Sequence, residues 1–355
     1  MRFSRLLALL PIIALAACSD GANTTSTQDS AGDTIGLSTI PPSVPPPSTI
    51  PPTTELVTTT TVPEVVFPLT GLPVNGSSLA LRPALVVKID NSPGAIPQTG
   101  FTAADLVYEE IVNDHISRFA MVFQSGNSDP VGPCRSGRIQ DVNLFGSLNG
   151  PLFAWSGGNV SVTKAINNSD LVNLGPNYAP VYYRSNVHSS PHNLYTKTTD
   201  IYTYAPPESQ PPAQQFQYRA AGEAVAGAPS TGVHVDMDNY AIDWAWNAGT
   251  GLYERKQEGK VHKDAATGSV ITTNNIVVLV MVYHAGQYSG SPDAQSVGSG
   301  ETFVFTGGNY IHGTWTRADR LLPFTLTDDS GAPIKLTPGR TFIELPKTDQ
   351  TEPAA

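Results

Sequence analysis

A turn-forming segment in the middle of the chain, Val131 to Arg138, carries two arginines and a serine within four positions. Arginine side chains bind carboxylate and phosphate oxygens through paired hydrogen bonds, so this segment favours a site for a polar or anionic ligand. Polar residues from other stretches could converge on it, which gives the candidate binding set Asp90, Asn91, Glu109, Arg118, Arg135, Ser136, Arg138, His192 and Asn193. The alternative is a buried network of salt bridges and hydrogen bonds that fixes loops without a ligand.

Some of these residues also suggest nucleophilic catalysis. Ser136 would be the nucleophile and His192 the base, oriented by Asp90 or Glu109. No Gly-x-Ser-x-Gly turn surrounds Ser136, which weakens this hypothesis. Cys134 could pair with His192 in the same way, because neighbouring arginines lower the pKa of a thiol, but a lone cysteine is more often simply packed. The sequence therefore assigns no catalytic residue.

No metal site is predicted. His188 and His192 are four residues apart, but Pro191 breaks the helix that would place them on one face, and no carboxylate is adjacent. Asp236 to Asn239 lacks the glycine and the distal glutamate of a calcium loop.

The composition limits the fold and the partners. With 31 glycines and 31 prolines among 355 residues, turns are frequent, which favours short strands over long helices. The formal net charge of −10 disfavours non-specific binding to nucleic acid or anionic lipid. The sequence contains no phosphate-binding glycine loop, dinucleotide fingerprint or basic nucleic-acid motif. We therefore expect no cofactor and no nucleic-acid partner.

The first eighteen residues have the order of a bacterial lipoprotein signal peptide. Arg2 and Arg5 precede an apolar run from Leu6 to Ala17, which is too short to cross a bilayer. The run ends in Leu15-Ala16-Ala17-Cys18, which resembles a lipobox, and lipid on the Cys18 sulfur would anchor the protein. An ordinary signal peptide with an incidental cysteine is the alternative. We expect a lipid anchor on the extracytoplasmic face of a bacterial membrane.

The rest of the chain divides by composition. Residues 19–67 are rich in Ser, Thr and Pro without apolar periodicity, and they predict a disordered, extended stalk. The expected fold class is α+β: a mixed α/β domain over 68–212 that carries the polar site, a linker over 213–231, and a small antiparallel β domain over 232–347. Residues 348–355 are predicted to be a disordered tail.

Two predicted structures position the polar residues of the first domain. The apolar run Ala84 to Ile89 predicts a buried strand that ends at Asp90. Leu106 to Val112 and Ser117 to Gln124 predict a hairpin joined by a short polar turn.

Within the hairpin, alternation places Glu109 and Glu110 on opposite faces of the first strand. One of the two carboxylates must therefore point among apolar residues, and a buried carboxylate needs a cationic partner. The expected partners are Arg118, Arg135 and Arg138.

The central segment is predicted to lead into a helix. Ser136 would cap a helix from Gly137 to about Leu148, because apolar residues recur there at roughly helical spacing. Arg135 and Ser136 would then lie at a helix N-terminus, whose free N–H groups favour an anion.

Several short motifs occur in one order between Pro68 and Pro346. They are Pro68-Leu69-Thr70-Gly71, Arg82-Pro83, Asp90-Asn91, Ala104 to Glu109, Arg118-Phe119, Gly132-Pro133, Arg135-Ser136, Arg138, Pro191 to Tyr195, Tyr253-Glu254-Arg255, Asn275 to Val278 and Gly313-Thr314-Trp315. With these motifs the sequence resembles the YerB-like bacterial lipoproteins, two-domain envelope proteins of unknown function. The resemblance implies a fold and a location but no activity. Cys134 departs from the family pattern, which usually has a small aliphatic residue there, and this argues against a nucleophilic role.

The sequence thus predicts a membrane-anchored, extracytoplasmic lipoprotein of unknown role. Its leading interpretation is a non-catalytic binding or scaffolding module for a polar or anionic envelope ligand, with wall polymer, peptide or another envelope protein as the candidate partners. The alternative is a cell-envelope hydrolase or transferase that uses Ser136 and His192.

Overall fold

The computed structural model describes residues 64–113, 116–286 and 291–354. The predicted signal peptide, the lipidation site Cys18 and the stalk up to residue 63 lie outside these described residues. The end of the predicted stalk is already structured, because Phe67 donates its N–H to the carbonyl of Leu72 at 2.8 Å and Val66 forms a bridge with Pro73. Within the described ranges, no helix has both the length and the apolar character needed to cross a membrane.

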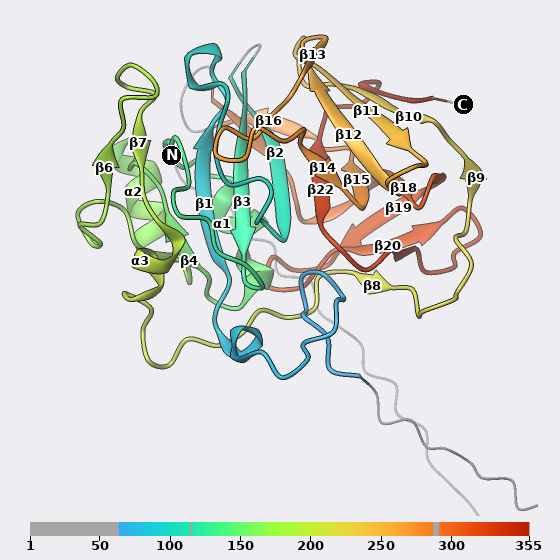
Figure 1. Cartoon of the computed structure of the whole chain (residues 1–355), viewed down its shortest axis with the longest axis horizontal. Helices are drawn as coiled ribbons and strands as arrows, with labels where there is room; N and C mark the ends of the chain where they lie inside the picture. The colour runs from blue at the N-terminus through green and yellow to red at the C-terminus, as the bar shows by residue number, and fades with distance from the viewer. Residues whose placement is uncertain (1–63, 114–115, 287–290, 355) are drawn as a thin grey trace, which may run out of the picture. The chain divides into compact units, whose positions relative to one another are not determined.

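A large mixed sheet organises the described chain (Figure 1). Its strands, in spatial order, are β20 (Thr325–Asp328), β19 (Asn309–Arg317), β18 (Gly298–Thr306), β15 (Asn275–Leu279), β22 (Thr341–Leu345), β2 (Leu106–Asn113), β3 (Ile116–Phe123), β1 (Leu85–Asp90), β4 (Leu152–Ala154) and β5 (Val172–Asn173), and β9 (Ala228–Pro229) pairs with β19. The predicted hairpin is confirmed as β2 and β3. Strands from both predicted domains share this sheet, because β22 pairs in parallel with both β15 and β2.

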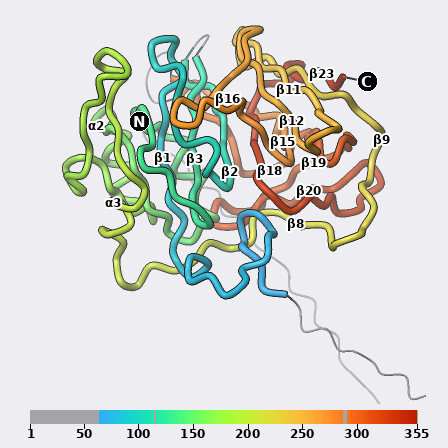
Figure 2. The backbone as a smooth tube through the Cα atoms, viewed as in Figure 1, coloured from blue at the N-terminus to red at the C-terminus, as the bar shows by residue number. Residues whose placement is uncertain are grey.

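A second sheet is built from strands of the C-terminal half of the chain. It comprises β13 (Lys260–Val261), β12 (Leu252–Gln257), β11 (Ala241–Asn247), β10 (Gly232–Asp236) and β23 (Thr351–Ala354), with β14 (Thr272–Thr273) paired to β12. The prediction of a disordered tail is wrong for residues 351–354, because β23 pairs antiparallel with β10 and extends the sheet (Figure 2). Pro353 is tolerated there since β23 is an edge strand.

The remaining elements are short. Three two-stranded ribbons join β16 (Tyr283–Ala285) to β17 (Pro292–Ala294), β21 (Lys335–Leu336) to β8 (Gln217–Tyr218), and β6 (Tyr183–Arg184) to β7 (Leu194–Tyr195). The helices are α1 (Asp141–Leu144), α2 (Val160–Asn167) and α3 (Thr198–Tyr202), with 3-10 turns η1 (Ser78–Leu81), η2 (Pro93–Ala95) and η3 (Gly146–Leu148). The fold is therefore richer in sheet than the α+β expectation, and the predicted linker 213–231 contains β8 and β9.

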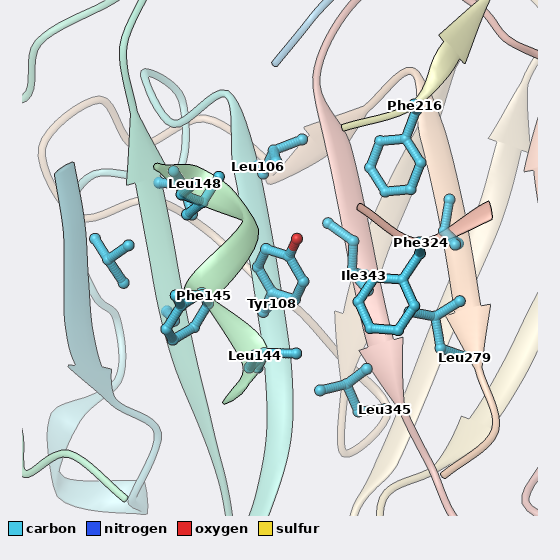
Figure 3. Packing of buried hydrophobic residues seen from close by; sticks show 14 of the residues in the cluster. Leu106, Tyr108, Leu144, Phe145, Leu148, Phe216, Leu279, Phe324, Ile343 and Leu345 are labelled. Atoms are coloured by element: carbon cyan, nitrogen blue, oxygen red, sulfur yellow. The ribbon is translucent and has the colours of Figure 1, made fainter. Parts of the chain in front are cut away.

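Each face of the large sheet buries its own core. On one face, Leu144, Phe145 and Leu148 lie over β2 beside Tyr108, and Ile343 and Leu345 of β22 continue this layer (Figure 3). On the other face, the large sheet packs against the second sheet, where the Trp244 ring meets Phe342 at 4.7 Å. Trp244 and Trp315 are both buried, so these tryptophans fill the core.

Candidate anion-binding site

Strand alternation divides the predicted polar set between the two faces of the large sheet. Asp90 lies opposite Arg118 in the β1–β3 register, on the face that α1 covers. Asn91 and Glu109 lie on the opposite face, where the Asn91 amide donates to Glu109 at 3.2 Å. The expectation of one converging set is thus corrected: the sheet separates Asn91 and Glu109 from the others.

Asp90, at the end of β1, is the centre of the first group. It is fully buried, and its Oδ1 accepts hydrogen bonds from the Ser92 N–H at 3.0 Å and the Ser92 hydroxyl at 2.7 Å. Its Oδ2 accepts a bond from Nδ1 of His192 at 2.7 Å. Burial raises the pKa of Asp90, but the bonds from His192 and Ser92 outweigh it and hold the pKa below its ordinary value. Asp90 is therefore ionised, and His192 carries its proton on Nδ1.

Arg118 and Arg135 lie beside this carboxylate and Arg138 lies near Arg118, and we call these three residues the arginine cluster. They lie close enough together that burial and mutual repulsion lower the pKa of Arg118 to about 9. Burial likewise lowers the pKa of Arg138. The cluster thus brings together three cations that the sequence placed in two separate segments.

The cluster has more positive charge and more donors than the protein satisfies. Arg135 places Nε 3.2 Å from Asp90 Oδ2 but without hydrogen-bond geometry. Arg118 and Arg138 have no carboxylate within 4.0 Å among the described residues, although Arg118 is 95% buried (relative exposure 5%). The Nε atoms of all three arginines are buried without a hydrogen-bond partner in this part of the chain. Unpaired donors and uncompensated charge favour an anion.

Extended backbone, rather than a helix, presents Arg135. The Arg135 N–H donates to the Lys88 carbonyl at 2.9 Å, and the Arg135 carbonyl accepts from the Ser156 N–H at 3.0 Å. These bonds fix the segment beside the end of β1. The predicted helix from Gly137 is therefore wrong: α1 has only four residues and begins at Asp141, and Ser136 caps nothing. The site gains no helix N-terminus.

The catalytic hypothesis finds little support in the geometry. Ser136 contributes its carbonyl, which accepts from Arg118 at 2.8 Å, and its hydroxyl has no hydrogen bond to His192 within the described ranges. Cys134 is buried, and burial raises the pKa of its thiol to about 12. A thiol with so high a pKa stays protonated at neutral pH and is a poor nucleophile. His192 is oriented by Asp90 but has no hydrogen bond to a nucleophile in the part of the chain that the structure describes.

The side chain of Asn193 forms hydrogen bonds within its own loop. Its amide donates to the Ser185 carbonyl at 3.1 Å, and its Oδ1 accepts from Arg184 at 2.8 Å. These bonds close the loop that carries His192. These contacts hold Asn193 in its loop, and its contact with a ligand stays a prediction.

A buried ion cluster that the sequence did not reveal adjoins the arginines. Lys88 of β1 bonds to Glu110 and, at 2.9 Å, to Asp141 of α1, and all three side chains are fully buried. Gln140 completes it by donating to Glu110 at 2.7 Å. Lys88 thus takes the place predicted for an arginine. Burial and the neighbouring Glu110 raise the pKa of Asp141 to about 6.

Replacing Asp141 with asparagine is expected to flatten the pH dependence of stability. The folded-state pKa of about 6 exceeds the ordinary 3.8, so the native state binds this proton more tightly. Its contribution to stability is present below the ordinary pKa and is lost as pH rises through the folded one. Denaturant unfolding at pH 4 and pH 7 should therefore give a smaller difference for D141N than for wild type. The exposed Asp349→Asn control should keep the wild-type difference, and an unchanged difference in D141N would contradict the prediction.

The opposite face holds a second buried polar network. Glu109 forms an ion pair with Arg255 of β12, and Arg255 also bonds to Gln257 and to Nδ1 of His262, each at 2.6 Å. Burial and Arg255 hold the pKa of His262 well below its ordinary value, so its imidazole is neutral. Arg255 lies 146 positions from Glu109, so nothing local in the sequence indicated the pair.

Glu344 of β22 lies opposite Glu109 in the parallel register. Burial and the nearby Glu109 carboxylate raise the pKa of Glu344 well above its ordinary value. This shift favours the protonated form of Glu344, and its Oε1 accepts from Trp244 Nε1 at 2.9 Å. Across the described ranges, no group of three or more His, Cys, Asp or Glu residues is arranged to hold a metal ion.

Two regions of the chain match the two halves of one protein family. Residues 69–210 match "Protein of unknown function (DUF3048) N-terminal domain", and residues 233–343 match the corresponding C-terminal domain. A relative named "Putative lipoprotein YerB", from Bacillus subtilis (strain 168), is 27% identical over 288 residues, which are 78% of this chain and 84% of the relative. The crystal structure of YerB protein from Bacillus subtilis is similar in fold, with a TM-score of 0.73 at 24% identity, over 82% of this chain and 100% of that one.

Proposed function

This chain belongs to the DUF3048 protein family, and from that premise we propose that it is a lipid-anchored envelope protein that binds an anionic ligand at its arginine cluster. The anchor is supported by the order of the leader, with Cys18 after Leu15-Ala16-Ala17, and by the relative that is named a lipoprotein. The Ser-, Thr- and Pro-rich residues that follow would carry the globular part away from the membrane surface.

One observation carries the binding proposal. Arg118 is almost fully buried, its Nε has no partner in the described residues, and no carboxylate lies within 4.0 Å of it there. Keeping a buried cation unpaired is costly, so such a group is expected where a ligand supplies the missing charge. Arg135 and Arg138 add two further guanidiniums. Together with Lys88, the three arginines make four cations against the three nearby carboxylates Asp90, Glu110 and Asp141, which favours an oxyanion over a neutral ligand.

Replacing Arg135 with alanine tests this proposal. Arg135 is the most suitable position because its side chain is 28% exposed and can be removed without opening the core. Titration calorimetry of the purified full chain with inorganic phosphate is expected to show binding. R135A should weaken this binding about 10- to 100-fold, which corresponds to the loss of one charge-assisted hydrogen bond. Affinity should also fall as the salt concentration rises.

Arg320 provides a matched control. Its side chain is 29% exposed, but it is already paired with Asp170 at 2.8 Å. Arg320→Ala should therefore leave phosphate affinity within about twofold of wild type. Absence of phosphate binding, or equal losses in R135A and R320A, would overturn the proposed function.

A further inference from the structure

A cavity of about 440 Å³ lies between the loop after β1 and the β12–β13 region. Figure 1 shows this loop and β13 at the same edge of the fold. Pro93 and Ile96 of the loop give the cavity an apolar wall, and Tyr240, Gln257 and Val261 line it from the second sheet. No member of the arginine cluster is among its described lining residues. The cavity is therefore a separate site, with the size and the mostly apolar lining that small ligands need.

The Tyr240 hydroxyl is a hydrogen-bond donor that the protein leaves available at this cavity. Gln257 Oε1 accepts from Arg255 at 2.6 Å, so the Gln257 amide N–H donates to the Tyr240 oxygen. Tyr240 is only 8% exposed, and its own O–H has no acceptor among the described residues. Burial and the Glu109 carboxylate raise the pKa of Tyr240 to about 12, so the hydroxyl keeps its proton at neutral pH. A ligand oxygen would satisfy this buried donor.

Glu258, in the turn between β12 and β13, supplies an acceptor to the same cavity. Its Oε1 accepts from the Ala241 N–H at 2.6 Å, which holds the carboxylate in place, and its Oε2 has no hydrogen bond in the described ranges. The other charged lining residue, Lys260, has the opposite sign, so the lining carries no excess charge. His262 offers no further donor, because its Nε2 proton is given to Gln98 at 2.8 Å. The cavity thus suits a neutral ligand that has both an acceptor and a donor.

We propose that this cavity binds the acetamido group of an N-acetylated sugar, independently of any anion at the arginine cluster. The carbonyl of the group accepts from the Tyr240 hydroxyl, its N–H donates to Glu258, and its methyl packs on Pro93 and Ile96. A peptide bond offers the same carbonyl and N–H, but the peptide chain must continue in both directions. A pendant acetamido group ends in its methyl, which suits a cavity better than an open groove, and the remaining volume takes the sugar ring.

Replacing Tyr240 with phenylalanine and Glu258 with glutamine tests the donor and the acceptor separately. N-acetylglucosamine, glucose and N-acetylalanine methylamide are titrated into the purified, isotope-labelled full chain, and backbone amide NMR shifts report binding. Wild type is expected to bind N-acetylglucosamine about tenfold or more tightly than glucose. For this sugar, Y240F should lose about 3- to 10-fold in affinity and E258Q about tenfold, as expected for one neutral and one charge-assisted hydrogen bond. The exposed Tyr178→Phe control should bind like wild type, and thermal unfolding checks that every variant folds.

The shifted amides show where each probe binds, and those of Ile96 and Val261 should move with N-acetylglucosamine. Absence of binding, glucose binding as tightly, or an affinity that survives both Y240F and E258Q would overturn the acetamido site. N-acetylalanine methylamide binding as tightly as N-acetylglucosamine would overturn the sugar and favour a peptide. None of the probes carries a phosphate, so these outcomes leave the proposed anion site to its own test.

Discussion

Replacing Arg255 with methionine is expected to lower the free energy of unfolding by about 3–5 kcal/mol, the usual cost of breaking a buried ion pair from one side. Arg255 and Glu109 are both fully buried. Without the guanidinium, Glu109 would keep its hydrogen bonds from Ser117 and Asn91 but would face Glu344 with no cation between them. The aromatic rings that pack on Arg255, including Phe119 at 5.2 Å, would also lose a cation–π contact.

Denaturant unfolding measures this effect directly. Lys256→Met is the matched control, because Lys256 is the next residue on β12 and is exposed, so its loss should cost less than about 0.5 kcal/mol. Adding Glu109→Gln to R255M should recover part of the stability, since no unpaired charge then remains at Glu109. A loss below about 1 kcal/mol in R255M would mean that the pair does not hold the two sheets together as we argue.

Replacing Lys88 with methionine is expected to cost about as much, roughly 3–5 kcal/mol at neutral pH, and to cost less in acid. Lys88 is the cation that separates the buried carboxylates of Glu110 and Asp141. The pKa of Asp141 is already about 6, and removing Lys88 raises it further. At pH 5 Asp141 is therefore neutral in the variant, and the repulsion between the two carboxyl groups is relieved.

Unfolding curves at pH 5 and pH 7.5 test the prediction for Lys88→Met. The loss in K88M relative to wild type should be smaller at pH 5 than at pH 7.5. Lys164→Met, on the exposed side of α2, should show a negligible loss at both values. Equal losses of K88M at the two pH values would show that Asp141 does not take up the proton.

The strands that carry the site follow from the sequence. The apolar run before Asp90 predicts β1, and alternation around a short polar turn predicts the β2–β3 hairpin, because both patterns are local. The need for a cation near the paired glutamates is also local, since a strand with two buried faces cannot leave a carboxylate alone. The sequence put Asp90 and Arg118 in one candidate set, and the β1–β3 register places them opposite each other.

The partners of those glutamates could not be predicted in the same way. Glu110 pairs with Lys88, which sits inside an apolar run and looks like an interruption of a strand. Glu109 pairs with Arg255, from the other half of the chain. Such choices depend on which strands become neighbours, and the sequence gives no local signal for that. The same alternation that placed the glutamates on two faces also separates Asn91 from Asp90.

The helix predicted after Ser136 failed for a tertiary reason. Apolar residues do recur there at helical spacing, and Leu144, Phe145 and Leu148 do pack on the sheet. Just before the predicted start, Arg135 pairs through its backbone with Lys88 and Ser156, and the Gly137 N–H donates to the Gly157 carbonyl at 3.2 Å. Pairing with the end of a strand outweighed helix propensity, which is a weak preference over a few residues.

The central position of β22 has a consequence for biogenesis. This strand is synthesised after both of its neighbours, yet it joins β15 to β2 in the middle of the sheet. A nascent or partly exported polypeptide that has not delivered residue 341 therefore presents two open backbone edges, which invite pairing with other chains. Folding of the large sheet is expected to wait for β22, and premature stop codons before β22 should yield aggregates in place of a usable N-terminal fragment.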